Sequence, residues 1–146
     1  MRIYFGRFEV DDQYPNLRVL NIESVVYVLD TVTRTVRTLE PRDSMQEYGS
    51  NGFAWGYLGT GPTALAYSLL LDTCGGDETQ FDAENIWNVK QNLVATWPWI
   101  RDMTDPRKRQ LLELRQADAF VTDSRKVLEA AGTLVSTDYL VEVSRG

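Results

Sequence analysis

The sequence predicts an α+β protein, in which a small antiparallel sheet from the N-terminal third packs against three or four helices. Three observations lead to this prediction. The first 40 residues are rich in β-branched and alternating apolar residues, a glycine-rich turn near residue 60 leads into an apolar helix, and helical periodicity dominates the rest. Strands that precede helices favour this class over alternating βαβ units. A length of 146 residues fits a single domain, 1–146.

The strands of the expected sheet come first. Residues 3–10 alternate between apolar and polar side chains, as a half-buried strand does. Residues 17–22 and 24–29 are rich in Val, Ile and Leu, which favour strands. A turn at residues 30–34 leads into a further strand at 35–39, in which threonine and arginine alternate with valine and predict one wet face.

A buried helix is expected over residues 62–72. Pro62 stands at its first position, where the missing N–H costs nothing. The residues that follow are apolar nearly all round, which is typical of a helix that is covered on most sides. Gly75 and Gly76 supply the left-handed residues that commonly end a helix.

A second helix is expected from near Asp82 to just before Pro98. Its apolar residues recur at helical spacing and form a stripe, Ile86, Val89, Leu93 and Trp97. Residues 41–51, which precede the first of these helices and its glycine-rich turn, are polar and predict a loop.

The last third predicts a helical extension, residues 101–146, to a core formed by residues 1–100. A third helix begins at Asp105, an N-cap residue followed by proline, and its apolar stripe ends at Val121. Residues 124–131 either continue it or form a short fourth helix. Residues 134–143 return as a terminal strand or a hairpin.

Composition excludes several kinds of chemistry. The chain has no histidine, so Ser-His-Asp and Cys-His catalysis and histidine-bound zinc are excluded. Cys74 is the single cysteine, so no intramolecular disulfide can form, and its place after an apolar helix predicts a buried, inert thiol. The longest apolar stretch, near residues 65–71, is far shorter than the ~20 residues that span a membrane. We expect a cytoplasmic protein with no cofactor and no membrane contact.

The net charge of −6 comes from one part of the chain. Between Asp43 and Val89 there are seven acidic residues and no basic one. A protein that binds the phosphate backbone shows the opposite bias, so we expect no direct nucleic-acid binding. We expect the contact with a partner to use carboxylates and a tryptophan of this stretch, Asp72, Asp77, Glu78, Asp82, Glu84 and Trp87.

The stretch Gly52-Phe53-Ala54-Trp55-Gly56-Tyr57-Leu58-Gly59-Thr60-Gly61-Pro62-Thr63-Ala64-Leu65-Ala66 carries a signature. It resembles a small bacterial and phage family that is known only as a domain of unknown function and reads roughly G-F-x-W-G-Y-x-G-[ST]-G-P-x-x-L-A. The resemblance covers about residues 3–100 and implies no activity. That family usually has a His before the Gly-Phe and a Glu at position 54. This chain has Tyr-Gly-Ser-Asn at 48–51 and Ala54, which weakens an enzyme interpretation.

The signature has two physical interpretations. In the structural one, which we favour, the glycines form a sharp corner before the helix and the aromatic residues are core. In the alternative, backbone amides hold a phosphate at the start of the helix and aromatic rings stack a base. The residues of that ligand site would be Trp55, Tyr57, Gly59, Thr60 and Gly61.

These observations favour a non-enzymatic acidic protein that acts by protein–protein contact. A phage or mobile element could encode it as an inhibitor of a host nucleic-acid enzyme or of a defence system such as CRISPR, because an acidic face can occupy a site built for phosphates. The alternative is a small nucleotide- or phosphate-binding domain. A weaker third hypothesis is a carboxylate–metal hydrolase that uses Asp77, Glu78, Asp82 and Glu84, although we expect no metal. The sequence also allows a homo-oligomer.

Overall fold

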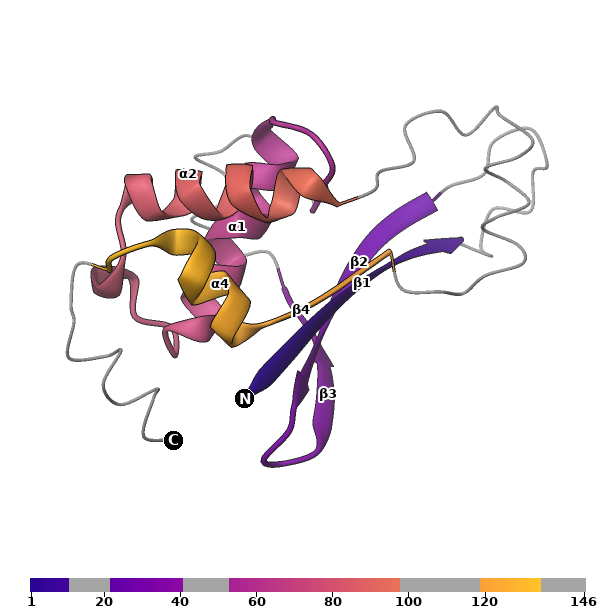
Figure 1. Cartoon of the computed structure of the whole chain (residues 1–146). Coiled ribbons are helices and arrows are strands. Elements are labelled where there is room, and N and C mark those ends of the chain that lie inside the picture. The colour runs from indigo at the N-terminus through magenta and orange to yellow at the C-terminus, as the bar shows by residue number, and fades with distance from the viewer. Residues whose placement is uncertain (11–21, 41–52, 98–118, 135–146) are drawn as a thin grey trace.

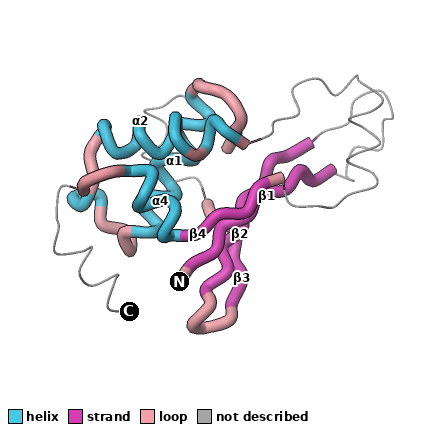
Figure 2. The backbone as a smooth tube through the Cα atoms, viewed as in Figure 1, coloured by secondary structure: helices cyan, strands magenta, loops and turns pink. Residues whose placement is uncertain are grey.

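Four strands form one antiparallel sheet in the computed structural model, in the order β3-β2-β1-β4. The structure describes residues 1–10, 22–40, 53–97 and 119–134, which Figure 1 shows in colour. The strands are β1 (Arg2–Val10), β2 (Ile22–Asp30), β3 (Thr35–Thr38) and β4 (Phe120–Asp123). Three helices gather on one side of this sheet, which confirms the expected α+β fold (Figure 2).

The turn between β2 and β3 is held by Asp30. The Asp30 carboxylate accepts hydrogen bonds from the backbone N–H groups of Val32 at 2.9 Å and Thr33 at 3.2 Å. These two donors are the main reason that the pKa of Asp30 is lowered. Arg34, at the tip, has a φ of 57° and lies in the left-handed region. The turn expected at residues 30–34 is therefore confirmed.

The fourth strand comes from the part of the chain expected to be helical. Val121 lies in β4 with its side chain 57% exposed, so the prediction that it closes a helical stripe is wrong. A separate helix, α4 (Ser124–Ala131), begins directly after the strand. Asp123 caps it by accepting a hydrogen bond from the backbone N–H of Lys126 at 2.9 Å.

Phe120 joins the sheet to the helices. It lies opposite Gly6 of β1, and a Cβ atom at position 6 would be only 2.2 Å from the Phe120 ring. A glycine there lets the ring cross β1. The ring stacks on Trp97, with 3.8 Å between centroids, and meets Trp55 edge to face at 5.0 Å.

The central helix, α1 (Thr60–Thr73), is buried nearly all round, as expected. It begins two residues earlier than predicted, so Pro62 is its third residue. Pro62 is still in the first turn, where backbone N–H groups need no partner within the helix. At its end, the N–H of Gly75 bonds to Asp72 O at 3.1 Å and the N–H of Gly76 to Leu71 O at 2.7 Å. Both glycines have positive φ, so the predicted left-handed stop is confirmed.

Helix α2 (Ala83–Asn92) follows α1 in the chain and packs on both α1 and α4. Asp82 and Asn85 cap its start reciprocally, each side chain accepting a bond from the other residue's N–H. The buried Asn85 amide also donates to the carbonyls of Ala131 and Thr133, both at 3.0 Å, and so ties α2 to the end of α4. Short 3₁₀ helices precede and follow α2, at Glu78–Gln80 and Val94–Thr96.

The two faces of the sheet differ in their surroundings. Alternate residues of the strands, including Tyr4, Val26 and Val28, are buried against the helical layer. The neighbours that point the other way are also mostly apolar: Ile3, Phe5, Val25, Tyr27, Leu29, Val36 and Val121. Antiparallel sheets with one wet face usually alternate apolar and polar residues, so this second face has the composition of a covered surface. No helix in the described part of the chain has the length and apolar character to cross a membrane.

Some expected elements lie outside the described residues. They are the strand residues before Ile22, the loop at 41–51, the helix that starts at Asp105 as far as residue 118, and all but the first residue of the terminal strand at 134–143.

Candidate functional site

The most concentrated group of charges in the described residues lies between the sheet and the end of α1. Asp72 occupies the last turn of α1, with its side chain only 10% exposed. Its Oδ2 atom pairs with Arg2 of β1 at 3.3 Å, and its Oδ1 atom pairs with Arg37 of β3. Arg2 also donates to the backbone carbonyl of Asp72. One carboxylate is thus shared between two guanidinium groups.

Tyr4 holds the same carboxylate from the core side. Its hydroxyl donates to Asp72 Oδ2 at 2.7 Å and lies 3.0 Å from Thr73 Oγ1. Burial and the adjacent negative charge of Asp72 raise the pKa of Tyr4, so the phenol stays neutral and can donate. Asp72 is therefore fixed by contacts from three residues of the sheet.

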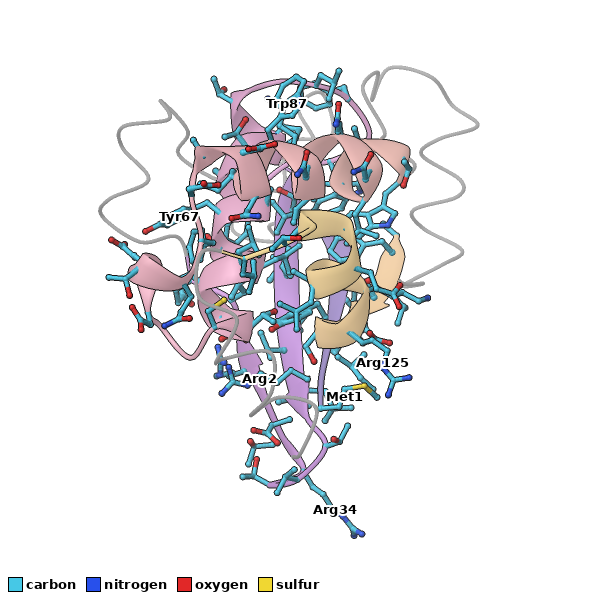
Figure 3. All side chains as sticks on the ribbon, turned by 60° about the vertical axis from the view of Figure 1, so that its left-hand side comes forward. Met1, Arg2, Arg34, Tyr67, Trp87 and Arg125 are labelled. Atoms are coloured by element: carbon cyan, nitrogen blue, oxygen red, sulfur yellow. The ribbon has the colours of Figure 1, made fainter. Side chains whose placement is uncertain are left out.

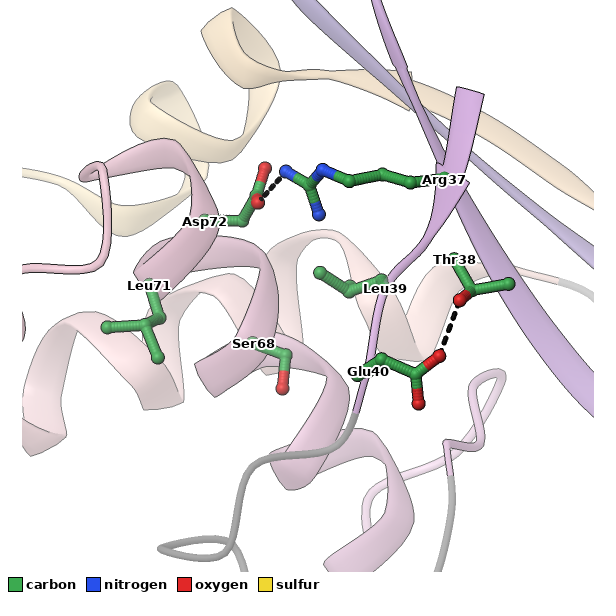
Figure 4. A pocket seen from close by; sticks show the side chains of 7 residues that line it. All are labelled: Arg37, Thr38, Leu39, Glu40, Ser68, Leu71 and Asp72. Atoms are coloured by element: carbon green, nitrogen blue, oxygen red, sulfur yellow. Dashed lines mark hydrogen bonds and ion pairs between the residues drawn. The ribbon is translucent and has the colours of Figure 1, made fainter. Parts of the chain in front are cut away.

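A cavity of about 250 Å³ opens beside this cluster. Residues 37–40, at the end of β3, line one side, and Ser68, Leu71 and Asp72 of α1 line the other. Figure 4 shows the paired Arg37 and Asp72 at one end of the cavity, Glu40 and Ser68 at the other, and Leu39 between them. The cavity thus combines an ion pair, an apolar wall and hydroxyl groups.

Sequence reasoning missed most of this site. It singled out Asp72 as a partner-binding residue, whereas the structure places the Asp72 carboxylate in contact with two arginines and Tyr4. Arg2 and Arg37 are ordinary strand residues in the sequence, far apart from one another. The sequence indicates only that each arginine lies on a strand among apolar residues. It does not indicate that the two arginines will contact the same carboxylate.

The glycine-rich corner is packed rather than open. Gly61 is buried, and a Cβ atom there would be 2.6 Å from the Ala54 methyl group. At Gly59, which is the N-cap of α1, a Cβ atom would be 2.6 Å from the Tyr57 ring. Close packing against the Tyr57 ring and the Ala54 methyl group therefore accounts for the two glycines.

The aromatic part of the proposed ligand site is also in the core. Trp55 is fully buried and contacts Phe120, so the structure places its ring in the core and not at an open ligand site. Tyr57 is partly exposed, and Thr60 is exposed at the first position of α1. The structure supports the interpretation of this segment as a corner that carries core aromatic residues.

The acidic segment, which we define as residues 77–87, follows the end of α1. Its four carboxylates are on exposed residues, and three of them have local partners. Asp77 accepts from the Thr79 hydroxyl at 2.6 Å, from Gln80 at 3.0 Å and from the Thr79 backbone N–H, and these bonds lower the pKa of Asp77. Glu78 accepts a bond from the hydroxyl of Tyr67.

The remaining members of this segment lie on α2. Asp82 is its N-cap, and Glu84 and Trp87 are three residues apart on its exposed side. Trp87 is 46% exposed, and Figure 3 shows it at the outer surface of α2. The ammonium group of Lys90 lies 4.8 Å from the centre of the Trp87 ring and donates to Thr63 Oγ1 at 2.8 Å. Lys90 therefore covers one face of the Trp87 ring, and the exposed part of the ring faces solvent.

The carboxylates do not gather around a common point. In the described part of the chain, no group of three or more Asp, Glu or Cys side chains could hold a metal ion. Asp77, Glu78, Asp82 and Glu84 therefore do not form the ligand set that a carboxylate–metal hydrolase would need. Cys74 is buried, and burial together with the charge of Asp77 raises the pKa of its thiol to about 11, so it stays protonated near neutral pH.

Comparison with known protein families identifies a match for most of the chain. Residues 22–126 match the model of a family of unknown function (DUF6166), which is more than half of the chain. The match extends past residue 100, where the helical extension was expected to begin, and takes in β4. No curated protein and no solved structure matches the chain.

Proposed function

Because the chain belongs to the family of unknown function DUF6166, we propose a function from the geometry of the chain itself: it is a non-enzymatic protein that acts by binding another protein. The contact uses the acidic segment, with Trp87 as its anchor. The observation that carries this proposal is the half-exposed Trp87 ring on a helix that begins with acidic residues. Tryptophan is enriched among the residues that dominate binding energy at interfaces.

The negative charge of the acidic segment indicates what kind of surface the partner has. Lys90 is the one basic residue between positions 53 and 97, and it is already engaged with Trp87 and Thr63. A partner that carries basic groups around an apolar pocket would be attracted to the carboxylates and would receive the Trp87 ring. A nucleic-acid enzyme has such basic groups for phosphates, which supports the finer proposal of an inhibitor encoded by a phage or mobile element.

The sheet supplies a second argument for protein contact. Its outer face is apolar, and two of its members, Val36 and Val121, are each 57% exposed. Exposed apolar surface of this kind often marks an interaction site. The nucleotide-binding alternative has weaker support, because Trp55 is buried and close packing against Tyr57 and Ala54 already accounts for Gly59 and Gly61.

The test uses matched baits in affinity purification from a host lysate, followed by titration of the purified partner. Trp87→Ala and Glu84→Lys change the proposed contact, while Leu58→Ala changes another exposed apolar residue at 58% exposure. We expect wild type and Leu58→Ala to bind the same protein, with an affinity that falls as salt rises. Trp87→Ala should weaken binding by at least about tenfold, as expected for an anchor residue. Equal binding by all four baits would refute the proposal.

A further inference from the structure

The cavity between β3 and α1 has a balanced set of charges only when the neighbouring Arg2 is counted with it. Arg37 contributes one positive charge to the lining, and Asp72 and Glu40 contribute two negative ones. Arg2 does not line the cavity, but it pairs with Asp72 and supplies the second positive charge. A phosphate would add negative charge beside two carboxylates, while both guanidinium groups are already paired with Asp72. A ligand that carries one charge of each sign leaves the balance unchanged.

Arg37 is positioned to receive a carboxylate. One of its terminal nitrogens donates to Asp72, which Arg2 and Tyr4 hold in place. The other N–H groups of this guanidinium have no hydrogen-bond partner among the described residues, and the side chain is 50% exposed. A guanidinium that is fixed in this way loses little freedom when it binds a carboxylate through its remaining donors.

Glu40 provides an acceptor at the other end of the cavity (Figure 4). Its residue is exposed, and the Thr38 hydroxyl donates to its Oε1 atom, which leaves Oε2 as an acceptor. Between the two ends, the buried side chain of Leu39 forms an apolar wall (Figure 4), and Leu71 and Ser68 of α1 also line the cavity.

We propose that this cavity binds a free α-amino acid, with its carboxylate on Arg37, its ammonium group near Glu40 and its side chain against Leu39 and Leu71. The volume of about 250 Å³ is below the ~300–1,000 Å³ of pockets that hold drug-sized ligands, so the ligand is small. The site uses none of the residues of the acidic segment, and it does not depend on the proposed protein contact.

The experiment screens the twenty free L-amino acids against the full chain by thermal shift and measures each positive by calorimetric titration. Bound ligand stabilises the folded state, so a binder raises Tm. For the best amino acid, three comparison probes follow: its analogue without the amino group, its analogue without the carboxylate, and inorganic phosphate. The variants are Arg37→Gln and Glu40→Gln. The matched control is Arg34→Gln, at the exposed hairpin tip (Figure 3).

We expect at least one amino acid to bind, and both analogues to bind about tenfold or more weakly, as the loss of a charged hydrogen-bonded pair predicts. Arg37→Gln and Glu40→Gln should each weaken binding to a similar extent, and Arg34→Gln should bind as wild type does. Glu40→Gln changes an exposed side chain, so it tests the site even where Arg37→Gln lowers stability. No binding by any of the twenty, equal binding by Glu40→Gln, or tighter binding of phosphate would each overturn the proposal.

Discussion

Tyr4 and Asp72, which are 68 positions apart in the chain, meet in a 2.7 Å hydrogen bond between the phenol hydroxyl and the carboxylate. This bond holds the negatively charged carboxylate of Asp72 at the boundary between the core and the two arginines, Arg2 of β1 and Arg37 of β3. Asp72 is thereby a structural residue that fixes how α1 sits on the sheet. Its neighbours in the sequence gave no indication of this role.

Asp72→Asn should destabilise the fold by about 1–3 kcal/mol, because Arg2 and Arg37 then face a neutral amide in a half-buried place. Urea unfolding followed by circular dichroism measures this loss. The matched control is Asp77→Asn, five residues later in an exposed turn, which should cost clearly less. Equal losses for the two variants would show that the shared carboxylate contributes no more than a surface one.

Gly61→Ala should destabilise the fold by about 1–3 kcal/mol, because the new methyl group would overlap the Ala54 methyl group at 2.6 Å. A second variant tests this cause directly by removing the Ala54 methyl group while the new one at position 61 is kept. In the double variant Ala54→Gly/Gly61→Ala the overlap disappears, so its loss should be smaller than the sum of the two single losses. Simple additivity in thermal or urea unfolding would contradict the close approach of these residues.

Phe120→Ala should destabilise the fold by about 3–5 kcal/mol, since the ring is buried between Trp55 and Trp97. Tryptophan fluorescence of the folded protein should change as well, because two indoles lose a neighbour. Val121→Ala, one residue along β4 and 57% exposed, is the control and should shift stability by no more than about 0.5 kcal/mol. A small loss for Phe120→Ala would mean that β4 is not needed for the core.

Stability should fall as the pH rises above 9, because the folded state keeps Cys74 protonated. The thiol ionises with its ordinary pKa of 9.0 in the unfolded chain and at about 11 in the folded one, so the unfolded state loses its proton first. The loss is at most on the order of 2–3 kcal/mol by pH 11.

Cys74→Ala should flatten this decline between pH 9 and pH 10 in urea unfolding curves. Tyr4, whose pKa is also raised, adds a decline above its ordinary value of 10.0 and should be unaffected by the variant. An unchanged slope in Cys74→Ala between pH 9 and pH 10 would assign the effect to another group.

Periodicity and turn residues predicted the elements that depend on local sequence. The strands at β1 to β3, the Asp30 turn and the glycine stop after α1 follow from patterns within a few residues, and the structure has them. The start of α1 was placed two residues late because Pro62 is acceptable anywhere in the first turn. Boundaries of this kind depend on packing, here the contact of Gly61 with Ala54.

Features that depend on distant contacts could not be predicted in the same way. β4 has only four residues, and Val121 fits a helical stripe as well as a strand until its pairing with Phe5 is known. The cluster around Asp72 assembles residues from β1, β3 and α1, which no local pattern connects. The acidic residues from position 77 onward are exposed, while Asp72 differs because the end of α1 faces two arginines.

The position of β4 beside β1 has a consequence for biosynthesis. The N–H of Arg2 bonds to the hydroxyl of Ser124 at 3.4 Å, although the two residues are 122 positions apart. As the polypeptide leaves the ribosome, one edge of β1 therefore has no β4 to pair with until residues 120–123 have emerged. Such non-local pairing is intrinsically slow, so the nascent chain exposes a hydrogen-bonding edge, which favours chaperone binding until β4 has paired.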